Sequence, residues 1–328
     1  FYTVTELGAE YGVSKITAQR VFRELVDRQI ISTHCRAGSF VTKMAQVKTV
    51  YLCLRDDHFS DSGRLDRFRA VDAFLEGVRS WSNGLFAKVE PVGLNFLRTH
   101  MEEFRGQPFL ISANVFLDVT ESGASLNRER LEEFRERLDP IAFHGFCALP
   151  GMSQARTDLY GGMRKIVDHL AQCHQRFACL MGDPRNPWFR PRLRAYVDAL
   201  LDHDFVFDPE KLKITTGEDR EEDFRAMDSI MSGPVRPTAL VCASDPRALH
   251  ALEYCQRKGI CVPDELAITG FDNLPESAMS HPLLTTLDGR NRESGIVAAE
   301  LLWKRMNGTL RSPVQRLVER ELVVRESA

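Results

Sequence analysis

The sequence predicts an α/β protein: a two-lobed body with parallel sheets, preceded by a small winged helix-turn-helix domain. Apolar strand-like runs alternate with amphipathic helical stretches from about residue 50 onward, a pattern typical of parallel α/β sheets. The body of about 280 residues exceeds what one hydrophobic core usually holds, so two lobes are expected. Two short helices and a β-hairpin are predicted within residues 1–43, ahead of this body.

The head begins with two predicted helices. Thr3 can cap the first, with Glu6 at the capping-box position, and Gly12 ends it. Ser14 can cap the second helix. Along that helix, residues near helical spacing predict an apolar face and an opposite polar face. The apolar set is Val13, Ile16, Val21, Phe22 and Leu25, and the polar set is Lys15, Gln19, Arg20 and Arg23.

The segment IISTHCRAGSFVTK predicts a β-hairpin with Gly38 in its turn and Arg36 at its tip. A hairpin directly after a helix-turn-helix is a wing. We expect the second helix to enter a major groove while Arg36 reaches phosphate or a minor groove. The alternative is a solvated helix followed by a hairpin. The candidate DNA-binding residues are Ser14, Lys15, Thr17, Gln19, Arg20, Arg36 and Gly38.

Charge is distributed unevenly along the chain. The net charge is −3, but residues 1–46 hold six Lys/Arg and four Asp/Glu, whereas the remainder holds 37 and 42. We therefore expect only the head to meet an anion. The sequence has neither 18 consecutive apolar residues nor a signal-peptide pattern, so we expect a cytoplasmic protein that does not contact a membrane. Residues 44–49 form a short polar linker.

The eight cysteines include no CxxC pair, and several lie in apolar runs, so we expect reduced, buried thiols. One segment, DHLAQCHQRFACL, holds four residues of types that can bind zinc, His169, Cys173, His174 and Cys179. Zinc needs four converging ligands, and the helix is predicted to end between these residues. We expect neither a metal nor a cofactor.

The body is predicted to alternate strands with helices. The strands are expected at residues 86–94, 108–116, 141–149, 176–182, 238–243 and 265–271, and the helices at 127–138, 160–172, 191–203, 219–232 and 246–258.

Ligands of such sheets bind beyond the carboxyl ends of the strands. Asp245 and Asp272 follow two predicted strands, and Arg192 opens a helix after a third, close to Trp188. Carboxylates, a guanidinium and an aromatic face together suit a polyhydroxylated ligand. Two alternatives remain open. The carboxylates could be a catalytic acid and base, although no catalytic motif is present, or they could cap helices and pair with arginines.

The head segment VSKITAQRVFRELVDRQIISTHCRAGSFV resembles the GntR-type winged helix. Lys15 replaces the family's usual arginine, and lysine lacks that residue's bidentate contact to guanine. The resemblance therefore does not imply the usual operator sequence. The matching residues are Ser14, Thr17, Arg20, Leu25, Ile30, Gly38, Phe40 and Val41.

The body resembles the effector domain of the LacI/GalR family, most densely in RPTALVCASDPRALHALEYCQRKGICVPDELAITGFDNLPESAMSHPLLTTL. RLRAYVDAL places Arg192 on the family's ligand-binding arginine, and Phe59 is a candidate for its stacking aromatic. The resemblance implies a periplasmic-binding-protein-like fold with a ligand in the interlobe cleft, and a homodimer. It implies a first lobe of about 50–154 plus 288–312 and a second of 155–287 plus 313–328. A GntR-type head on such a body resembles the arabinose-repressor architecture.

We therefore expect a sugar-responsive transcriptional regulator, a repressor rather than an enzyme, which binds operator DNA. A sugar-processing enzyme would be distinguished by turnover of its ligand. A transport-type binding protein is disfavoured by the basic head and the missing signal peptide.

Overall fold

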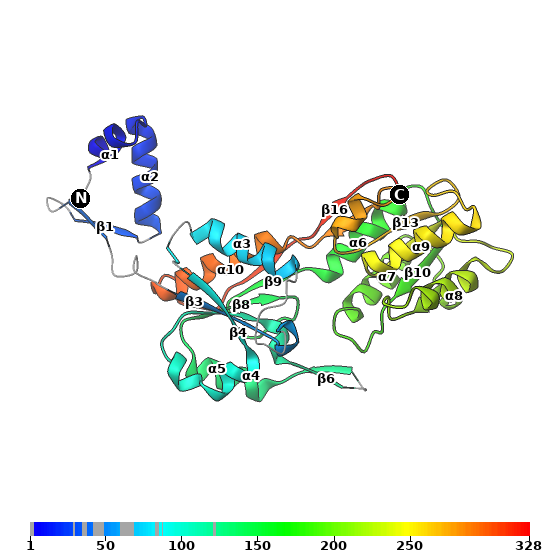
Figure 1. Ribbon diagram of the computed structural model, residues 1–328, viewed down its shortest axis with the longest axis horizontal. Coiled ribbons are helices and arrows are strands. Elements are labelled where there is room, and N and C mark those ends of the chain that lie inside the picture. Colours follow the sequence, from blue (N-terminus) through cyan, green and yellow to red (C-terminus); the bar gives the residue numbers. More distant parts are fainter. Residues whose placement is uncertain are drawn as a thin grey trace. The chain divides into compact units, whose positions relative to one another are not determined.

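The computed structural model describes residues 3–28, 30–34, 38–41, 49–59, 69–82, 85–86, 88–120 and 123–328 (Figure 1). The chain divides into two compact units. The first holds residues 1–115, 129–155 and 291–316, and the second holds 116–128, 156–290 and 317–328. The first unit thus includes the head, and the second takes residues 116–128, which lie within the first lobe in the expected division.

The first unit contains the head and a six-stranded sheet in the order β15-β9-β8-β5-β3-β4. Strands β4, β3, β5 and β8 run parallel. Helices α3 and α10 pack against each other beside this sheet (Figure 1). Its elements are α1 (Val4–Glu10), α2 (Lys15–Asp27), β1 (Ile31–His34), β2 (Gly38–Val41), β3 (Thr49–Leu54), α3 (Arg69–Ser82), β4 (Lys88–Gly93), α4 (Leu94–Thr99), β5 (Phe109–Ser112), α5 (Arg128–Arg137), β8 (Ile141–Gly145), β9 (Gln154–Thr157), α10 (Asn291–Met306) and β15 (Gln315–Val318).

The caps predicted for the head helices are confirmed. Thr3 Oγ1 accepts the Glu6 N–H at 3.2 Å, and the Glu6 carboxylate accepts the Thr3 N–H at 2.7 Å, which completes the capping box. Ser14 Oγ accepts the Thr17 N–H at 3.1 Å at the start of α2. Between the helices Gly12 has φ +63°, a conformation that glycine adopts without a Cβ penalty.

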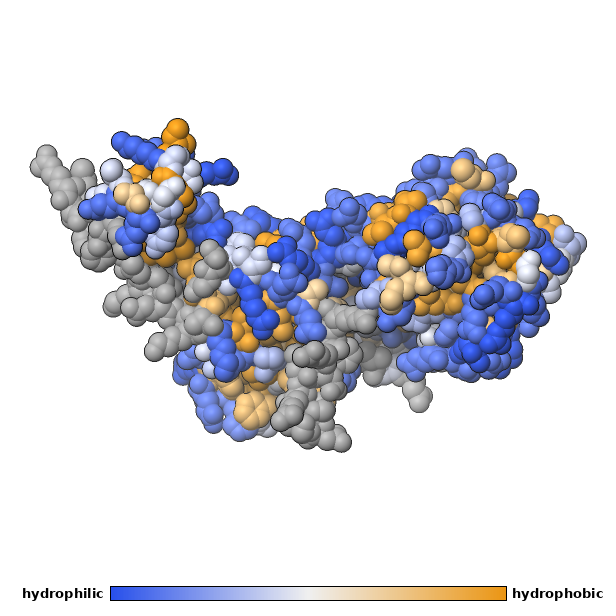
Figure 2. Space-filling model, turned by 45° about the horizontal axis from the view of Figure 1, so that its top comes forward, coloured by the Kyte–Doolittle hydropathy of each residue, from blue (hydrophilic) through white to orange (hydrophobic). Residues whose placement is uncertain are grey.

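The predicted apolar face of α2 is wrong in part. Ile16 is 78% exposed, and Val21 is exposed too. The covered face instead contains Ala18, Phe22 and Leu25, which are about one helical turn apart. Ala18 is buried because it packs against Gly8 of α1. Apolar side chains accordingly reach the surface of the head, as Figure 2 shows.

The hairpin predicted after α2 is present. β1 and β2 pair antiparallel, with Ile31 opposite Val41 and His34 opposite Gly38. Gly38 was predicted in the turn, but it pairs with His34 and is the first residue of the second strand. The predicted tip residue Arg36 and the linker residues 44–48 lie outside the described residues.

The second unit is built on a four-stranded parallel sheet in the order β11-β10-β12-β13. Helices α8 and α9 bury apolar residues such as Met227 and Leu252 in one core with Leu180, Leu240 and Ile268 of the sheet. Its elements are β6 (Leu117–Thr120), β7 (Gly123–Leu126), α6 (Leu159–Leu170), β10 (Phe177–Met181), α7 (Arg190–Asp202), β11 (Leu212–Ile214), α8 (Arg220–Met231), β12 (Ala239–Cys242), α9 (Asp245–Lys258), β13 (Ala267–Thr269), β14 (Thr286–Asp288) and β16 (Glu321–Val323).

The strands and helices predicted for the body are confirmed in type and order, with shorter strands than expected. The strand predicted over 108–116 ends at Ser112, and a short 3-10 turn follows it. Among the described elements, the sequence did not predict the hairpin β6–β7, the helices α4 and α10, or the strands β9, β11, β14, β15 and β16. None of the described helices has both the length and the apolar character needed to cross a membrane.

Candidate functional site

Three predicted ligand-binding residues lie beyond the carboxyl edge of the sheet in the second unit. Arg192 is on α7, which follows β10; Asp245 begins α9 after β12; and Asp272 follows β13. Because β10, β12 and β13 are parallel, the loops that follow them meet at one edge. The sequence prediction therefore places these three side chains at a common edge of the sheet, as the structure does.

Arg192 and Asp272 make the central contact of the site. Arg192 is only 4% exposed, and its Nη2 lies 3.5 Å from Asp272 Oδ1. Its Nη1 donates to the Ala243 carbonyl. The guanidinium lies over the Phe271 ring, with Cζ 3.8 Å from the ring centroid. Burial lowers the pKa of Arg192 to about 10, so the side chain remains a cation at neutral pH.

The backbone at Asp272 is strained. Asp272 has φ +118° and the next residue, Asn273, has φ +51°, conformations that residues with a Cβ rarely adopt. The Asp272 N–H donates to the Leu287 carbonyl at 2.9 Å, and Arg325 donates to the Asn273 side-chain oxygen at 2.7 Å. The surrounding structure thus holds the backbone at Asp272 and Asn273 in this conformation. Strain of this kind motivates a functional hypothesis for Asp272.

Asp245 lies in the same region but is completely buried. Its Oδ2 accepts the Leu274 N–H at 2.6 Å and the Ser277 hydroxyl at 2.7 Å, and its Oδ1 accepts the Thr286 hydroxyl. Burial raises the pKa of the carboxyl group, and these hydrogen bonds oppose that shift. Both oxygens are therefore used to join three segments, which favours the alternative in which this aspartate has a structural role.

Phe189, like Phe271, is an aromatic residue close to the Arg192 guanidinium. The Phe189 ring centroid lies 5.5 Å from Arg192 Cζ and 5.0 Å from Arg247 Cζ. Trp188 is partly exposed, and its backbone N–H donates to the Asn186 side chain. The sequence prediction named Trp188 as the aromatic of this site, and Phe189 is its neighbour in sequence.

Arg320 is a site residue that the sequence prediction missed. It precedes β16, is 7% exposed, and its Nη1 lies 3.5 Å from Asp272 Oδ1. Its Cζ lies 4.7 Å from the Phe271 ring centroid. In the sequence it is one of several charged residues near a carboxyl-terminal strand, and no local pattern marks it as buried.

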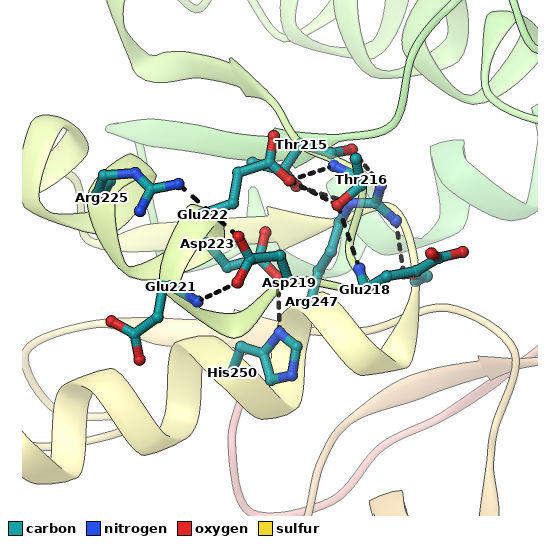
Figure 3. Close-up of polar contacts among 11 residues, drawn as sticks. Thr215, Thr216, Glu218, Asp219, Glu221, Glu222, Asp223, Arg225, Arg247 and His250 are labelled. Carbon is teal, nitrogen blue, oxygen red and sulfur yellow. Dashed lines mark hydrogen bonds and ion pairs between the residues drawn. The ribbon is translucent and has the colours of Figure 1, made fainter.

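Figure 3 shows a polar network that fixes the loop after β11 against α9. Arg247 Nε donates to Thr215 Oγ1 at 3.1 Å, Nη2 to the Thr215 carbonyl, and Nη1 to Ser244 Oγ at 2.9 Å. In the same view, His250 Nδ1 and the buried carboxylate of Asp223 form a hydrogen bond of 2.7 Å. Since Arg247 also lies against Phe189, this network supports the aromatic wall of the site.

In the first unit, polar and aromatic residues also follow the carboxyl ends of parallel strands. The ring of the predicted residue Phe59 lies 3.7 Å from the place that a Cβ atom on Gly93 would occupy. His144, at the end of β8, stacks on Phe74 at 4.0 Å between ring centroids. Among the described residues, His144 Nε2 and Asn114 Oδ1 are buried without a hydrogen-bond partner. The sequence prediction missed His144 and Asn114 because it placed both inside longer apolar strands.

The candidate DNA-binding residues lie at the start of α2 and in the hairpin. Ser14 and Thr17 hydrogen-bond to each other through their hydroxyls at 2.9 Å. Lys15, Gln19 and Arg20 are exposed, and the first two are one helical turn apart. The start of α2 thus presents basic and amide side chains to the surrounding solvent.

The two cysteines of the segment DHLAQCHQRFACL differ in burial. Cys179 is buried within β10, whereas Cys173 is exposed after α6. Within the described ranges, no group of three or more His, Cys, Asp or Glu side chains could hold a metal ion.

Comparison with known proteins identifies relatives of the body. Residues 167–328 match the family of periplasmic binding protein-like domains. The HTH-type transcriptional repressor CytR of Escherichia coli (strain K12) is 36% identical over 157 residues, which cover 48% of this chain and 46% of CytR. The chain thus spans less than half the length of this curated relative.

Solved structures show the same fold. The transcriptional repressor AscG of Escherichia coli has a TM-score of 0.69 at 16% identity and covers 86% of this chain and 99% of AscG. The complex of the transcriptional regulator CelR with cellobiose has a TM-score of 0.65 at 21% identity and covers 100% of both chains. Residues 167–328 therefore form a periplasmic binding protein-like domain, and its relatives in sequence and fold include transcriptional regulators.

Proposed function

We propose that this chain is a DNA-binding transcriptional repressor whose affinity for its operator changes when a small effector binds. The observation that carries the proposal is the contact between Arg192 and Asp272. This contact lies at the carboxyl edge of a parallel sheet, and the backbone of Asp272 is strained. The domain that holds it matches CytR, which is a transcriptional repressor.

The effector is a sugar or a sugar derivative. Asp272 can accept hydrogen bonds from hydroxyl groups, Arg192 can donate to ring or hydroxyl oxygens, and Phe189 offers an apolar face. Phe59, which lies in the first unit, is a further candidate contact. The structure of CelR, a neighbour in fold, is that of a complex with cellobiose, which supports this class of effector.

The head is a GntR-type winged helix, and it binds operator DNA. This assignment is supported by the hairpin β1–β2 directly after α2, and by exposed Lys15, Gln19 and Arg20 at the start of that helix. The residues at the start of a recognition helix contact base edges in the major groove. A cytoplasmic homodimer would present two such helices to the half-sites of a two-fold symmetric operator.

Effector and operator are coupled through a conformational equilibrium. An effector that binds one of two conformations more tightly shifts the population toward that conformation. The resulting change in DNA affinity is limited by the ratio of the effector's affinities for the two conformations. By linkage, DNA changes the affinity for effector by the same factor, typically about 5–150-fold. For a repressor released by its effector, each ligand weakens the binding of the other.

The test has two stages. A thermal-shift screen of pentoses, hexoses and their acids and phosphates identifies an effector by the rise in melting temperature. Fluorescence anisotropy with a duplex selected from random DNA then measures operator affinity with and without that effector. The Arg192→Gln variant should lose the effector response and keep its DNA affinity, while Arg194→Gln, an exposed position on the same helix, should behave as the unmodified protein. An effector that binds tightly but leaves operator affinity unchanged would refute the proposal.

A further inference from the structure

Two buried guanidinium groups of the second unit share one oxygen atom. Arg192 Nη2 and Arg320 Nη1 both lie 3.5 Å from Asp272 Oδ1. Charge-assisted N–H···O bonds are normally about 2.7–2.9 Å long, so neither contact has the length of a strong ion pair. The Asp272 side chain, which both arginines contact, is 38% exposed, so solvent weakens its interaction with the two cations.

Several N–H groups of these arginines have no acceptor. Arg192 Nε, Arg320 Nε and Arg320 Nη1 are buried without a hydrogen-bond partner among the described residues. Buried donors are almost always satisfied in native proteins, by protein, water or a ligand. Three unsatisfied nitrogen atoms on two adjacent guanidinium groups therefore indicate a missing acceptor with several oxygen atoms.

The nearby carboxylates do not supply that acceptor. Burial lowers the pKa of Arg320, and Asp272, Asp288 and Asp158 oppose this shift. However, Asp158 Oδ1 accepts a backbone N–H at the start of α6, and both oxygens of Asp288 accept hydrogen bonds within the loops of this unit. The oxygens of Asp245 are used in the same way.

The Phe271 ring covers a face of each guanidinium group. Both arginines lie over the Phe271 ring, at 3.8 and 4.7 Å from its centroid, and Phe271 is fully buried. A guanidinium covered on its face by an aromatic ring still donates in its own plane, which suits bidentate binding of a carboxylate or phosphate.

We propose that the effector carries an oxyanion, a carboxylate or a phosphate, and that Arg320 and Arg192 bind this group while Asp272 accepts its hydroxyl groups. The inference rests on the proposed effector role of this site and specifies its ligand as an acidic sugar derivative. It also assigns a binding role to Arg320, which separates this site from one built for a neutral sugar.

The first test uses inorganic phosphate as the probe on the full chain. The melting temperature is measured against phosphate concentration, with sodium chloride at equal ionic strength as the reference. We expect a saturable rise with phosphate in the unmodified protein and in Arg194→Gln, and at least a tenfold weaker response in Arg320→Gln. Arg320→Lys, which keeps the charge but loses the planar fork, should be intermediate. Equal responses of the unmodified protein and Arg320→Gln, or no response beyond that to chloride, would overturn the proposal.

The second test distinguishes the two sources of the oxyanion. Calorimetry compares glucose, glucuronate and glucose 6-phosphate, which share a ring and differ in charge. Preference for glucuronate indicates a carboxylate, and preference for glucose 6-phosphate indicates a phosphate; either preference should disappear in Arg320→Gln. Tighter binding of glucose than of both acids would contradict the inference. Anion binding that depends on Arg320 but has no effect on operator affinity would refute the regulator proposal, while the anion-binding role of Arg320 and Arg192 would stand.

Discussion

The indole Nε1–H of Trp303 donates a hydrogen bond to the backbone carbonyl of Arg28, at 2.5 Å. Arg28 follows the last turn of α2, and its guanidinium donates to the Trp81 carbonyl at 3.0 Å and lies over the Trp81 ring. Trp303 is on α10, which begins at residue 291, where the chain passes from the second unit into the first. The end of the candidate recognition helix thus contacts a helix that follows directly on the candidate effector domain.

We expect Trp303→Phe to weaken the coupling between effector and operator. The change removes the indole donor and leaves the Arg28 carbonyl without its partner, at a cost of about 1–3 kcal/mol. Operator affinity measured with and without effector should therefore differ less than in the unmodified protein, while effector affinity is retained. Trp81→Phe is the matched control, because Arg28 donates to the backbone of that residue. Unaltered coupling in Trp303→Phe would exclude this contact as the route.

Asp245 and Asp272 should respond differently to substitution. Asp245→Ala leaves a backbone N–H and two buried hydroxyl groups unpaired, so we expect a loss of unfolding free energy on the order of 3 kcal/mol. Asp272→Asn should instead lower effector affinity, because its side chain is partly exposed and accepts from the ligand. Urea unfolding measures the first effect and calorimetry the second. If Asp245→Ala were as stable as the unmodified protein, Asp245 would have no structural role and would again be a candidate ligand contact.

The same two residues show how far the sequence could predict the site. The apolar runs before Asp245 and Asp272 are enough to locate both at the carboxyl edge of one sheet, since parallel strands end at the same side. What each carboxylate contacts depends on segments remote in sequence, such as Thr286 for Asp245 and Arg320 for Asp272. Periodicity does not report such contacts. For the same reason it misassigned Ile16, whose exposure depends on how α1 packs against α2.

Gly182→Ala should disrupt the aromatic wall of the site. A Cβ atom on Gly182 would lie 2.3 Å from the Phe189 ring, so the ring must move away from Arg192. Overpacking of this kind typically costs about 1–3 kcal/mol. Effector affinity and melting temperature should both fall. The double variant Gly182→Ala/Phe189→Leu relieves the clash, so it should recover the melting temperature but not the effector affinity. If the loss of stability in the double variant equalled the sum of the losses in the two single variants, this explanation would be wrong.

The stability of the first unit should depend on the protonation of His144. Burial and, to a smaller extent, the neighbouring His58 lower the pKa of His144 to about 3. An unfolded histidine has a pKa near 6.5, so the unfolded state binds one more proton between these values. His144 therefore adds to the loss of stability as the pH falls from about 6.5 to about 3, by about 1.4 kcal/mol per pH unit.

His144→Phe should remove this contribution and keep a ring against Phe74. Urea unfolding between pH 7 and pH 4 measures the effect as a difference in slope between the two proteins, because their other titrating groups are shared. We expect the variant to lose less stability on acidification. Parallel pH profiles would show that His144 is protonated in the folded state.

The head offers a prediction that separates affinity from sequence preference. Arg20 is exposed on α2, and neutralising it should weaken binding to every duplex, because a phosphate contact acts through charge. Gln19 also lies on the exposed face of α2, and its amide can pair with a base edge. We therefore expect Gln19→Ala to change which sequence is selected from random DNA, with a cost of about 1–3 kcal/mol at one position.

Gel-shift titrations at two or more salt concentrations distinguish the two roles. For Arg20→Gln, the slope of log affinity against log salt should fall by about 1 in magnitude, because one fewer counterion is released. Gln19→Ala should keep the slope of the unmodified protein, because an amide side chain neutralises no phosphate. If the slope were unchanged in Arg20→Gln and the selected sequence unchanged in Gln19→Ala, α2 would not be the helix that contacts DNA.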